Sequence, residues 1–376
     1  MKKITILYLV FFSINTFGQT PLFKRVSVLL KKDILSEANH NLKEKPITVT
    51  SYYSSRSAGG KHDFFSEGDY WWPDPINLNG PYIQKDGLTN PENFTAHRKA
   101  MIRFSKIVAN QTAAYIITKD KKYASHAIHH IKAWFIDTAT MMNPSLLYAQ
   151  AIKGKVTGRG IGIIDMIQMI EVAKSIEILT KHDLIAPYDR IQIDNWFRSY
   201  LKWVTSHPYG IEEREAKNNH GTCWVMQVSA FAHLVKDTSL LNFCKDRFRK
   251  VIIPNQMDTN GSFPLELKRT KPYGYSLFNV DAVMTIAHIH NIKDPILKKA
   301  VEFMYPYIKD KNSWPFPKDV MYWEEWPVAT PFLLFGYQNY NEPAWLNTWE
   351  KLNHYPTNEE VIRNLPIRNP IIWLVD

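Results

Sequence analysis

Apolar residues along most of the chain recur at the three- and four-residue spacing of amphipathic helices. Between residues 193 and 204 they follow i, i+3, i+4, i+7, i+8 and i+11, with polar residues on the opposite face. Short breaks with turn residues separate the stripes, and alternating strand patterns are almost absent. We therefore predict an all-α fold of antiparallel helical hairpins. The other stripes run through residues 96–118, 121–137, 162–181, 220–236, 238–251, 278–290, 296–308 and 323–338.

Residues 47–94 interrupt this pattern, because they are rich in Gly, Pro, Asn and Asp and have no helical period. Long loops inside compact domains usually carry function. The segment also contains several aromatic residues, which disordered linkers seldom do. We predict an ordered aromatic loop layer over the helical body, in which Trp71 and Trp72 stack on sugar rings. The alternative, that these aromatic residues only anchor the loop to the core, stays open.

The first eighteen residues have the features of a secretory signal peptide, with Lys2 and Lys3 followed by an apolar stretch. We expect cleavage before Gln19 and a periplasmic or secreted protein with one domain over residues 19–376. No cysteine stands at the cleavage point and no later apolar run is long enough to span a bilayer, so we expect no membrane anchor. A disulfide between Cys223 and Cys244 and a pair of buried thiols are both compatible with the sequence.

The net charge of the chain indicates what class of partner it binds. Taking Lys2 and Lys3 from the 46 basic residues leaves 44 against 36 acidic ones, a formal charge of +8. A basic exported protein often binds something anionic. We expect an acidic polysaccharide, because no nucleic-acid-binding motif is visible. Surface lysines that serve only solubility are the alternative, and the oligomeric state stays open.

The stretch EAKNNHGTCWVMQ places Asn218, Asn219 and His220 at the mouth of a predicted helix. Asparagine is a preferred N-cap residue, and a helix N-terminus favours an anion such as a carboxylate. A histidine at the same place transfers protons near neutral pH. The set therefore fits a site that binds a carboxylate and moves a proton, although a capped helix with a partly buried histidine has the same sequence.

A second stretch, PLELKRTKPYGYSLFN, places Arg269 six residues before Tyr275, just ahead of the helix predicted from residue 278. β-Elimination on a uronic acid polymer needs groups that neutralise the carboxylate, remove the C5 proton and protonate the O4 leaving group. Asn219 and Arg269 suit the first need. His220 and Tyr275 suit the two proton transfers, and a nearby arginine would help a tyrosine to act as a base.

The segments NNHGTCW, ELKRT…YS, SEGDYWWPDP and GRGIGIIDM together resemble the alginate lyase superfamily, over most of residues 45–340. The resemblance implies an incomplete (α/α) toroid and a metal-independent lyase without a cofactor. Asn219 and His220 match the Asn-His motif of that family, and Arg269 and Tyr275 match its Arg…Tyr motif. Alginate, glucuronan and other uronate polymers all remain possible substrates. The candidate substrate-binding residues are Asn218, Tyr70, Trp71, Trp72, Tyr273 (also a rival to Tyr275), Gln150 and Arg159.

Two other functions stay open. A carboxylate pair would support an inverting glycoside hydrolase on the same scaffold, and an aromatic loop would support a non-catalytic glycan-binding protein. The histidines of the 121–137 stripe lack an HExxH motif and an apparent third ligand, so we expect no metal site. The carboxylates considered for the hydrolase are Asp63, Glu67, Asp69, Glu324 and Glu325.

Overall fold

The structure is a computed structural model that describes residues 20–375. The expected signal peptide lies outside the described residues, so its cleavage stays a prediction. Within residues 20–375 no helix is both long and apolar enough to cross a membrane.

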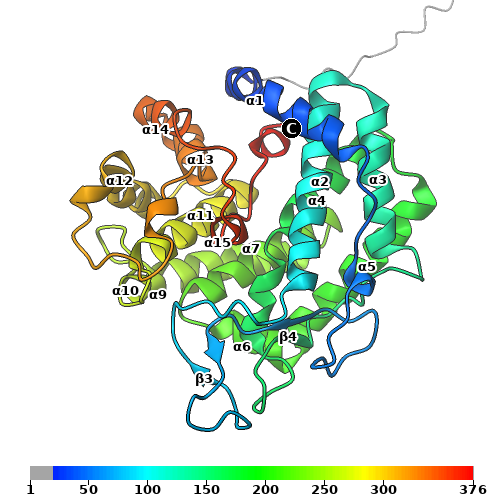
Figure 1. The fold of residues 1–376 in the computed structure, drawn as a ribbon. Helices are drawn as coiled ribbons and strands as arrows, with labels where there is room; N and C mark the ends of the chain where they lie inside the picture. Colours follow the sequence, from blue (N-terminus) through cyan, green and yellow to red (C-terminus); the bar gives the residue numbers. More distant parts are fainter. Residues whose placement is uncertain (1–19, 376) are drawn as a thin grey trace, which may run out of the picture.

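Five inner helices form a succession in which each helix packs against the next (Figure 1). α7 and α11 are buried along almost their whole length, as expected of helices that are apolar on nearly every side. Both lie in the middle of the succession, and they contact each other. The inner helices are α2 (Ala96–Thr118), α4 (Met169–Lys181), α7 (Asn219–Leu234), α11 (Pro272–His290) and α13 (Pro331–Tyr340).

A second set of helices covers the inner ones from outside. α12 is an example of an outer helix that buries one apolar face on the inner helices. Its buried residues Leu297, Val301, Met304 and Ile308 form one stripe that faces α11 and α13. The outer helices are α3 (Lys121–Phe135) on α2, α5 (Pro187–Ser206) on α3 and α7, α8 (Thr238–Arg247) on α7, α12 (Pro295–Lys309) on α11, and α14 (Pro343–Trp349) on α13. α1 (Pro21–Asn41) packs against α2.

Shorter elements connect these helices or follow them. The short helices are α6 (Pro208–Glu215), α9 (Ile253–Gln256), α10 (Pro264–Leu267) and α15 (Glu359–Arg363). The 3₁₀ turns are Val49–Ser51, Gly160–Met166, Lys311–Ser313, Trp323–Glu325 and Pro370–Trp373, and Phe248–Ile252 is a π-helical turn.

The segment 47–94 has no α-helix, as predicted, and lies along the lower end of the helical body in Figure 1. β1 (Phe65–Glu67) pairs in parallel with β4 (Tyr148–Ala151), which ties the loop to the body. β2 (Trp71–Trp72) pairs antiparallel with β3 (Ile83–Gln84) to form a short ribbon. Side chains of successive strand residues point to opposite faces, so Trp71 and Trp72 lie on different faces of this ribbon.

Several predicted helix bounds were wrong. α11 begins at Pro272 rather than near residue 278, because the Asp319 carboxylate accepts hydrogen bonds from the backbone N–H groups of Tyr273 and Gly274, each at 2.9 Å. The predicted helix 323–338 is only a 3₁₀ turn followed by α13, since Pro327 and Pro331 cannot donate the backbone bonds of a continuous helix.

Three further differences are local. The predicted helix 162–181 divides into a 3₁₀ turn and α4. The predicted helix 238–251 divides into α8 and the π-helical turn that follows it. α1 was not predicted, although its buried residues recur at helical spacing. Cys223 and Cys244 form no disulfide, and both are buried thiols.

Candidate active site

Asn219 is the first residue of α7, and Asn218 is its N-cap. The Asn218 side-chain oxygen accepts a hydrogen bond from the His220 backbone N–H. Asn219 donates its backbone N–H and its Nδ2 to the two carboxylate oxygens of Glu266, at 2.7 and 2.8 Å. The helix end is therefore held by a carboxylate of the chain itself. Nδ2 has two hydrogens, so this bond leaves one of them for a substrate carboxylate.

His220 is positioned by Glu213 of α6. The His220 Nδ1 lies 2.8 and 3.0 Å from the two Glu213 carboxylate oxygens. Burial raises the pKa of the Glu213 carboxyl group, and the contact with His220 acts in the opposite direction. An ionised Glu213 accepts the Nδ1 proton and leaves Nε2 as the basic nitrogen of the ring. The chain therefore contains a carboxylate–imidazole pair suited to general base catalysis.

Arg269 follows α10 and contacts both an acid and the candidate tyrosine. Its Nη2 donates to Asp86 at 2.9 Å and lies 3.4 Å from the Tyr275 hydroxyl oxygen. Its guanidinium carbon is 4.5 Å from the centre of the Tyr275 ring. Burial lowers the Arg269 pKa, but the bond to Asp86 and the charges of Asp86, Tyr275 and Glu266 together outweigh burial and keep this pKa above its ordinary value. Arg269 is therefore a cation that does not lose its proton.

Glu266 links the two halves of the site. Burial raises the pKa of this carboxyl group, whereas the Asn219 bonds and the charges of Arg269 and His220 lower it. The Arg269 backbone N–H also donates to the Glu266 carbonyl oxygen at 3.0 Å. The structure thus brings together the helix-mouth residues and the Arg…Tyr segment, which lie about fifty positions apart in the sequence.

Tyr275 lies in the first turn of α11, and only 8% of its surface is exposed. Its hydroxyl oxygen is 2.7 Å from that of Tyr70, which comes from the loop layer. Burial and Tyr70 raise the Tyr275 pKa well above its ordinary value, while Lys271 and Arg269 act to lower it. Tyr275 is therefore a phenol in this arrangement, in the state needed to donate a proton to a leaving group.

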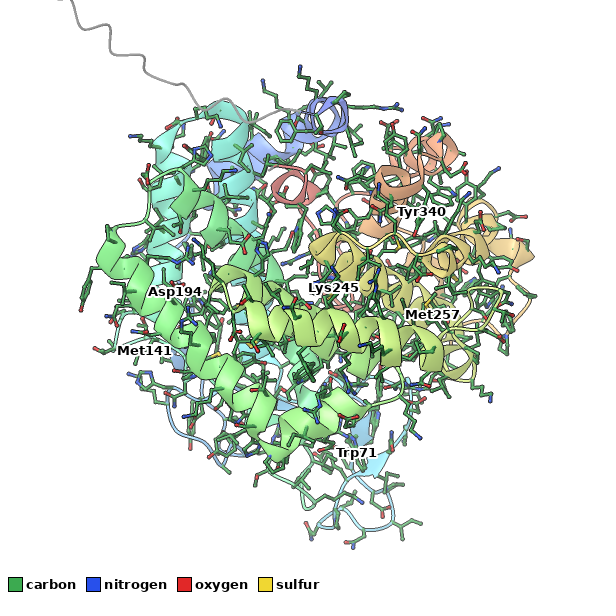
Figure 2. The ribbon with its side chains drawn as sticks, turned by 180° about the vertical axis from the view of Figure 1, so that it is seen from behind. Trp71, Met141, Asp194, Lys245, Met257 and Tyr340 are labelled. Carbon is green, nitrogen blue, oxygen red and sulfur yellow. The ribbon has the colours of Figure 1, made fainter. Side chains whose placement is uncertain are left out.

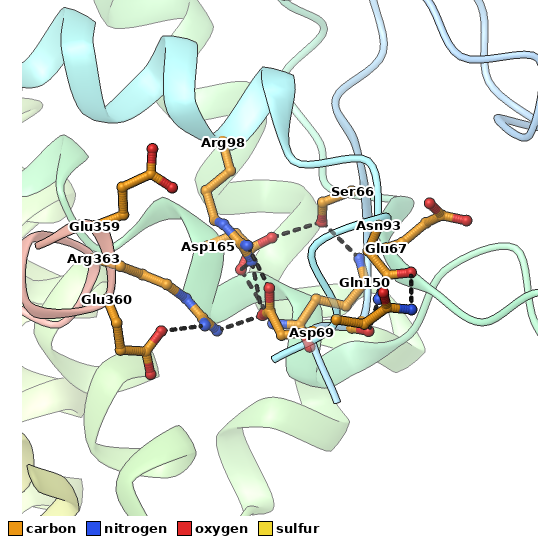
Figure 3. Close-up of polar contacts among 12 residues, drawn as sticks. Ser66, Glu67, Asp69, Asn93, Arg98, Gln150, Asp165, Glu359, Glu360 and Arg363 are labelled. Atoms are coloured by element: carbon orange, nitrogen blue, oxygen red, sulfur yellow. Dashed lines mark hydrogen bonds and ion pairs between the residues drawn. The ribbon is translucent and has the colours of Figure 1, made fainter. Parts of the chain in front are cut away.

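A buried ionic network surrounds Asp69, the residue before Tyr70 in the chain (Figure 3). Asp69 accepts from Arg98 of α2 at 2.5 and 2.9 Å and lies 2.8 Å from Arg363 of α15. The C-terminal segment adds Glu360, whose carboxylate is 2.5 Å from the Lys271 ammonium. The network therefore joins the loop layer, an inner helix and the C-terminal segment directly beside Tyr70.

Tyr273 is not part of this group. It is fully buried, its hydroxyl donates to the Tyr307 carbonyl oxygen at 3.0 Å, and its ring contacts Trp314 and Trp323. Consecutive turns of a helix bring residues three or four apart to one face, whereas residues two apart point in different directions. This core position does not suit a substrate contact or the proton-transfer role.

Gln150 and Arg159 form a wall next to Trp71. Arg159 donates to the Gln150 carbonyl and side-chain oxygens at 2.9 and 3.1 Å, and its guanidinium carbon is 5.8 Å from the Trp71 ring centre. Gln150 also donates to Asp165 at 3.1 Å and has a positive φ of 50°. Its side chain is thus occupied by protein partners, and Arg159 is the better placed of the two for a ligand. Trp72 donates from its ring nitrogen to the Leu88 carbonyl at 2.9 Å.

Four of the five carboxylates considered for a hydrolase pair with other side chains of the protein. Glu67 and Asp69 are buried in ion pairs, Asp63 accepts from Asn143, and Glu324 pairs with Lys311. No group of three or more potential metal-binding His, Cys, Asp or Glu side chains occurs within residues 20–375.

A helical toroid in which Glu266 joins the Asn219 helix mouth to the Arg269…Tyr275 segment is the arrangement expected of a polysaccharide lyase. The alginate lyase family model matches residues 48–314, which is well over half of the chain. This chain belongs to the alginate lyase family.

Two solved structures illustrate the likeness. The crystal structure of an alginate lyase from Bacteroides ovatus matches with a TM-score of 0.78 and 28% identity, over 96% of this chain and 99% of that one. A variant of alginate lyase A1-III complexed with a tetrasaccharide matches with a TM-score of 0.53 and 13% identity, over 85% and 87%, which shows a shared fold. The predicted all-α toroid is thereby confirmed. No curated protein matched the chain.

Four acidic residues and one lysine of the site were not predicted. Four of them contact residues far apart in the chain, whereas Glu213 is only seven positions before His220 but lies in a separate helix, α6. Acidic residues in a charged stretch such as IEEREAK give no local signal of burial. The lysine stands in the KRTKPYGY stretch, but nothing in that stretch indicates an ion pair with the C-terminal segment. These residues are Asp86, Glu213, Glu266, Glu360 and Lys271.

Proposed function

We propose that this lyase cleaves a uronic acid polymer, such as alginate or a glucuronan-like chain, by β-elimination. The observation that carries the proposal is the 3.4 Å contact between the Arg269 guanidinium and the Tyr275 hydroxyl. A carboxylate bound by Arg269 would place its sugar next to a proton donor. The named activity of the Bacteroides ovatus structure supports alginate as one substrate to test.

The chemistry begins with the carboxylate. The C5 proton of a uronate is weakly acidic while the adjacent carboxylate keeps its full negative charge. Asn219 donates its remaining amide hydrogen and Arg269 supplies a positive charge, so negative charge that develops during proton removal is stabilised. Asp86 holds Arg269 and Glu266 holds Asn219, which keeps both donors in position before the substrate binds.

The two proton transfers fall to His220 and Tyr275. In mannuronate and glucuronate the C5 proton and O4 lie on the same side of the ring, so one group can serve both steps. Tyr275 would first have to lose its own proton, which burial and Tyr70 oppose and which Lys271 and Arg269 favour. In guluronate and iduronate they lie on opposite sides, so two groups are needed. His220 with Glu213 would then remove the proton and Tyr275 would protonate O4. His220→Ala should therefore damage cleavage of guluronate most.

The hydrolase alternative gains no support from the carboxylates that the sequence suggested for it. An inverting hydrolase needs one carboxylic acid with a raised pKa. Asp69 is the opposite case: burial raises its pKa, but Arg363 and Arg98 outweigh burial and hold the pKa well below its ordinary range. The proposal also includes export of the enzyme, which places it where an extracellular polysaccharide would be met.

A panel of uronate polymers tests the proposal directly. β-Elimination produces a 4,5-unsaturated uronate that absorbs in the ultraviolet, and we expect this absorbance with at least one polymer. New reducing ends without the absorbance would show a hydrolase. Binding without either product would show a glycan-binding protein. Both of the last two results would overturn the proposal.

A further inference from the structure

The turn after β4 presents two lysines next to the aromatic loop layer. Ile152 and Val156 exchange backbone hydrogen bonds at 2.9 and 3.1 Å, which closes a tight turn around Lys153, Gly154 and Lys155. Gly154 has a φ of 77°, and a Cβ at this position would lie 2.8 Å from the Pro81 Cα. The turn is therefore packed against the loop that leads into β3.

Each lysine of this turn lies over an aromatic ring, of Trp71 in β2 or of Tyr82 just before β3. The Lys153 ammonium is 5.5 Å from the Tyr82 ring centre, and the Lys155 ammonium is 5.2 Å from the Trp71 ring centre. The Tyr82 backbone N–H also donates to the Lys153 carbonyl oxygen at 3.1 Å, which fixes the first pair. Tyr82 and Trp71 are half-buried, whereas both lysines are exposed. Figure 2 shows Trp71 in the lower part of the molecule.

These lysines carry charge that the chain does not neutralise. Within residues 20–375 neither of them forms an ion pair with a carboxylate. They line an open cleft of about 580 Å³ together with Tyr209 of α6, and its one arginine, Arg56, is paired with Glu67 at 2.5 Å. The cleft therefore has a net positive wall.

We propose that Lys153, Lys155, Tyr82 and Trp71 form an accessory binding surface for uronate residues outside the cleaved bond. This inference rests on the proposed function, because the surface begins at Trp71. That residue follows Tyr70, which contacts the candidate catalytic residue Tyr275. A uronate residue has an apolar C–H face and one carboxylate. Its face would lie on an aromatic ring while the lysine pairs with its carboxylate.

An exposed cation–aromatic contact is weak. An ammonium group can therefore leave the ring and turn to a carboxylate at little cost, and this movement uncovers the ring face for the sugar. The surface thus recognises a polymer that carries regularly spaced carboxylates, and it binds neutral polysaccharides less well. Its effect should be larger on long chains than on the shortest substrate.

The test is the double variant Lys153→Gln/Lys155→Gln. Lys31→Gln/Lys32→Gln is the matched control, because both lysines are exposed on α1, which lies at the opposite end of the molecule from β3 (Figure 1). KM and kcat are measured on the cleaved polymer and on the shortest cleaved oligomer, at low and high salt. The loss of two exposed charge contacts should raise KM for the polymer by roughly tenfold at low salt. Screening should shrink this difference at high salt.

Two outcomes would overturn the inference while the proposed function stands. One is a polymer KM equal to that of the control, and the other is an equal loss on polymer and oligomer. If the wild-type enzyme releases no unsaturated uronate, the proposed function fails instead. Retardation of the wild type and the double variant in gels that contain alginate then tests the surface without catalysis. Equal retardation of the two proteins would refute the surface.

Discussion

Asp69→Asn tests whether the buried ionic network holds the loop layer on the helical body. Asparagine has nearly the same shape but no charge, so the substitution leaves Arg98 and Arg363 without their shared carboxylate. The Asp69 side chain is 3% exposed and the Arg98 side chain 7% exposed, so water cannot replace the lost partner.

The size of the effect follows from the partners that remain. Removing one member of a buried ion pair typically costs about 3–5 kcal/mol. Arg98 keeps Asp165 at 3.3 Å and Arg363 keeps Glu360 at 3.2 Å, so we expect the lower end of this range. The free energy of unfolding should fall by about 3 kcal/mol near neutral pH. Turnover of the folded variant should fall as well, because Tyr70 follows Asp69 in the chain and contacts Tyr275.

Urea unfolding followed by tryptophan fluorescence measures the change. Asp246→Asn is the control, since this carboxylate forms an exposed ion pair with Lys250 at 2.7 Å. The control should unfold at the same urea concentration as the wild type. An Asp69→Asn protein as stable and as active as the control would refute this account of the network.

The pH dependence provides a second check. The Asp69 pKa is depressed in the folded state, so its contribution to stability is present above the unfolded value of about 4. It is lost as the pH falls through the lower folded value. The difference in stability between wild type and Asp69→Asn should therefore shrink in acid. A difference that stays constant down to pH 2 would contradict the depressed pKa.

Four other predictions concern single positions. Arg269→Ala should lower kcat by on the order of 10²–10³ without unfolding the protein, and near-full activity would remove its role. Tyr275→Phe should abolish cleavage of every substrate, whereas Tyr273→Phe should affect mainly stability. The reverse result would show that Tyr273, and not Tyr275, is the catalytic tyrosine. Burial raises the pKa of Asp281 to about 8, so the native protein keeps this proton up to higher pH than the unfolded chain does. Asp281→Asn should therefore become more stable relative to wild type as the pH rises from about 4 to 8. A difference between the urea midpoints of the two proteins that stays constant over this pH range would contradict the prediction. Mass spectrometry of the protein exported by its host should find Gln19 at the N-terminus, and a retained leader would disprove the expected cleavage.

Local patterns in the sequence determined most of the helical architecture. α3, α5 and α12 follow apolar stripes that the chain carries within each helix, because one buried face per helix is a local property of the sequence. The start of α7 at Asn218 was also predictable from the sequence. An N-cap interaction involves only the side chain of the cap residue and the backbone of the first helical turn. The choice of Asn219, His220, Arg269 and Tyr275 as one set came from the chemistry of the residues and the family resemblance.

Tertiary structure decided what those residues contact. The start of α11 depends on Asp319, which lies more than forty positions away, so no local pattern at residues 272–278 contains it. The same holds for Glu266, which lies 47 positions from Asn219. Glu213 is only seven positions before His220, but it lies in a separate helix, so the packing of α6 against α7 brings the two side chains together. Tyr273 and Tyr275 are equivalent in the sequence, and only the packing of α11 turns one into the core and the other toward Arg269 and Tyr70. Buried ion pairs form between distant segments, and a sequence read along its length does not show which segments will meet.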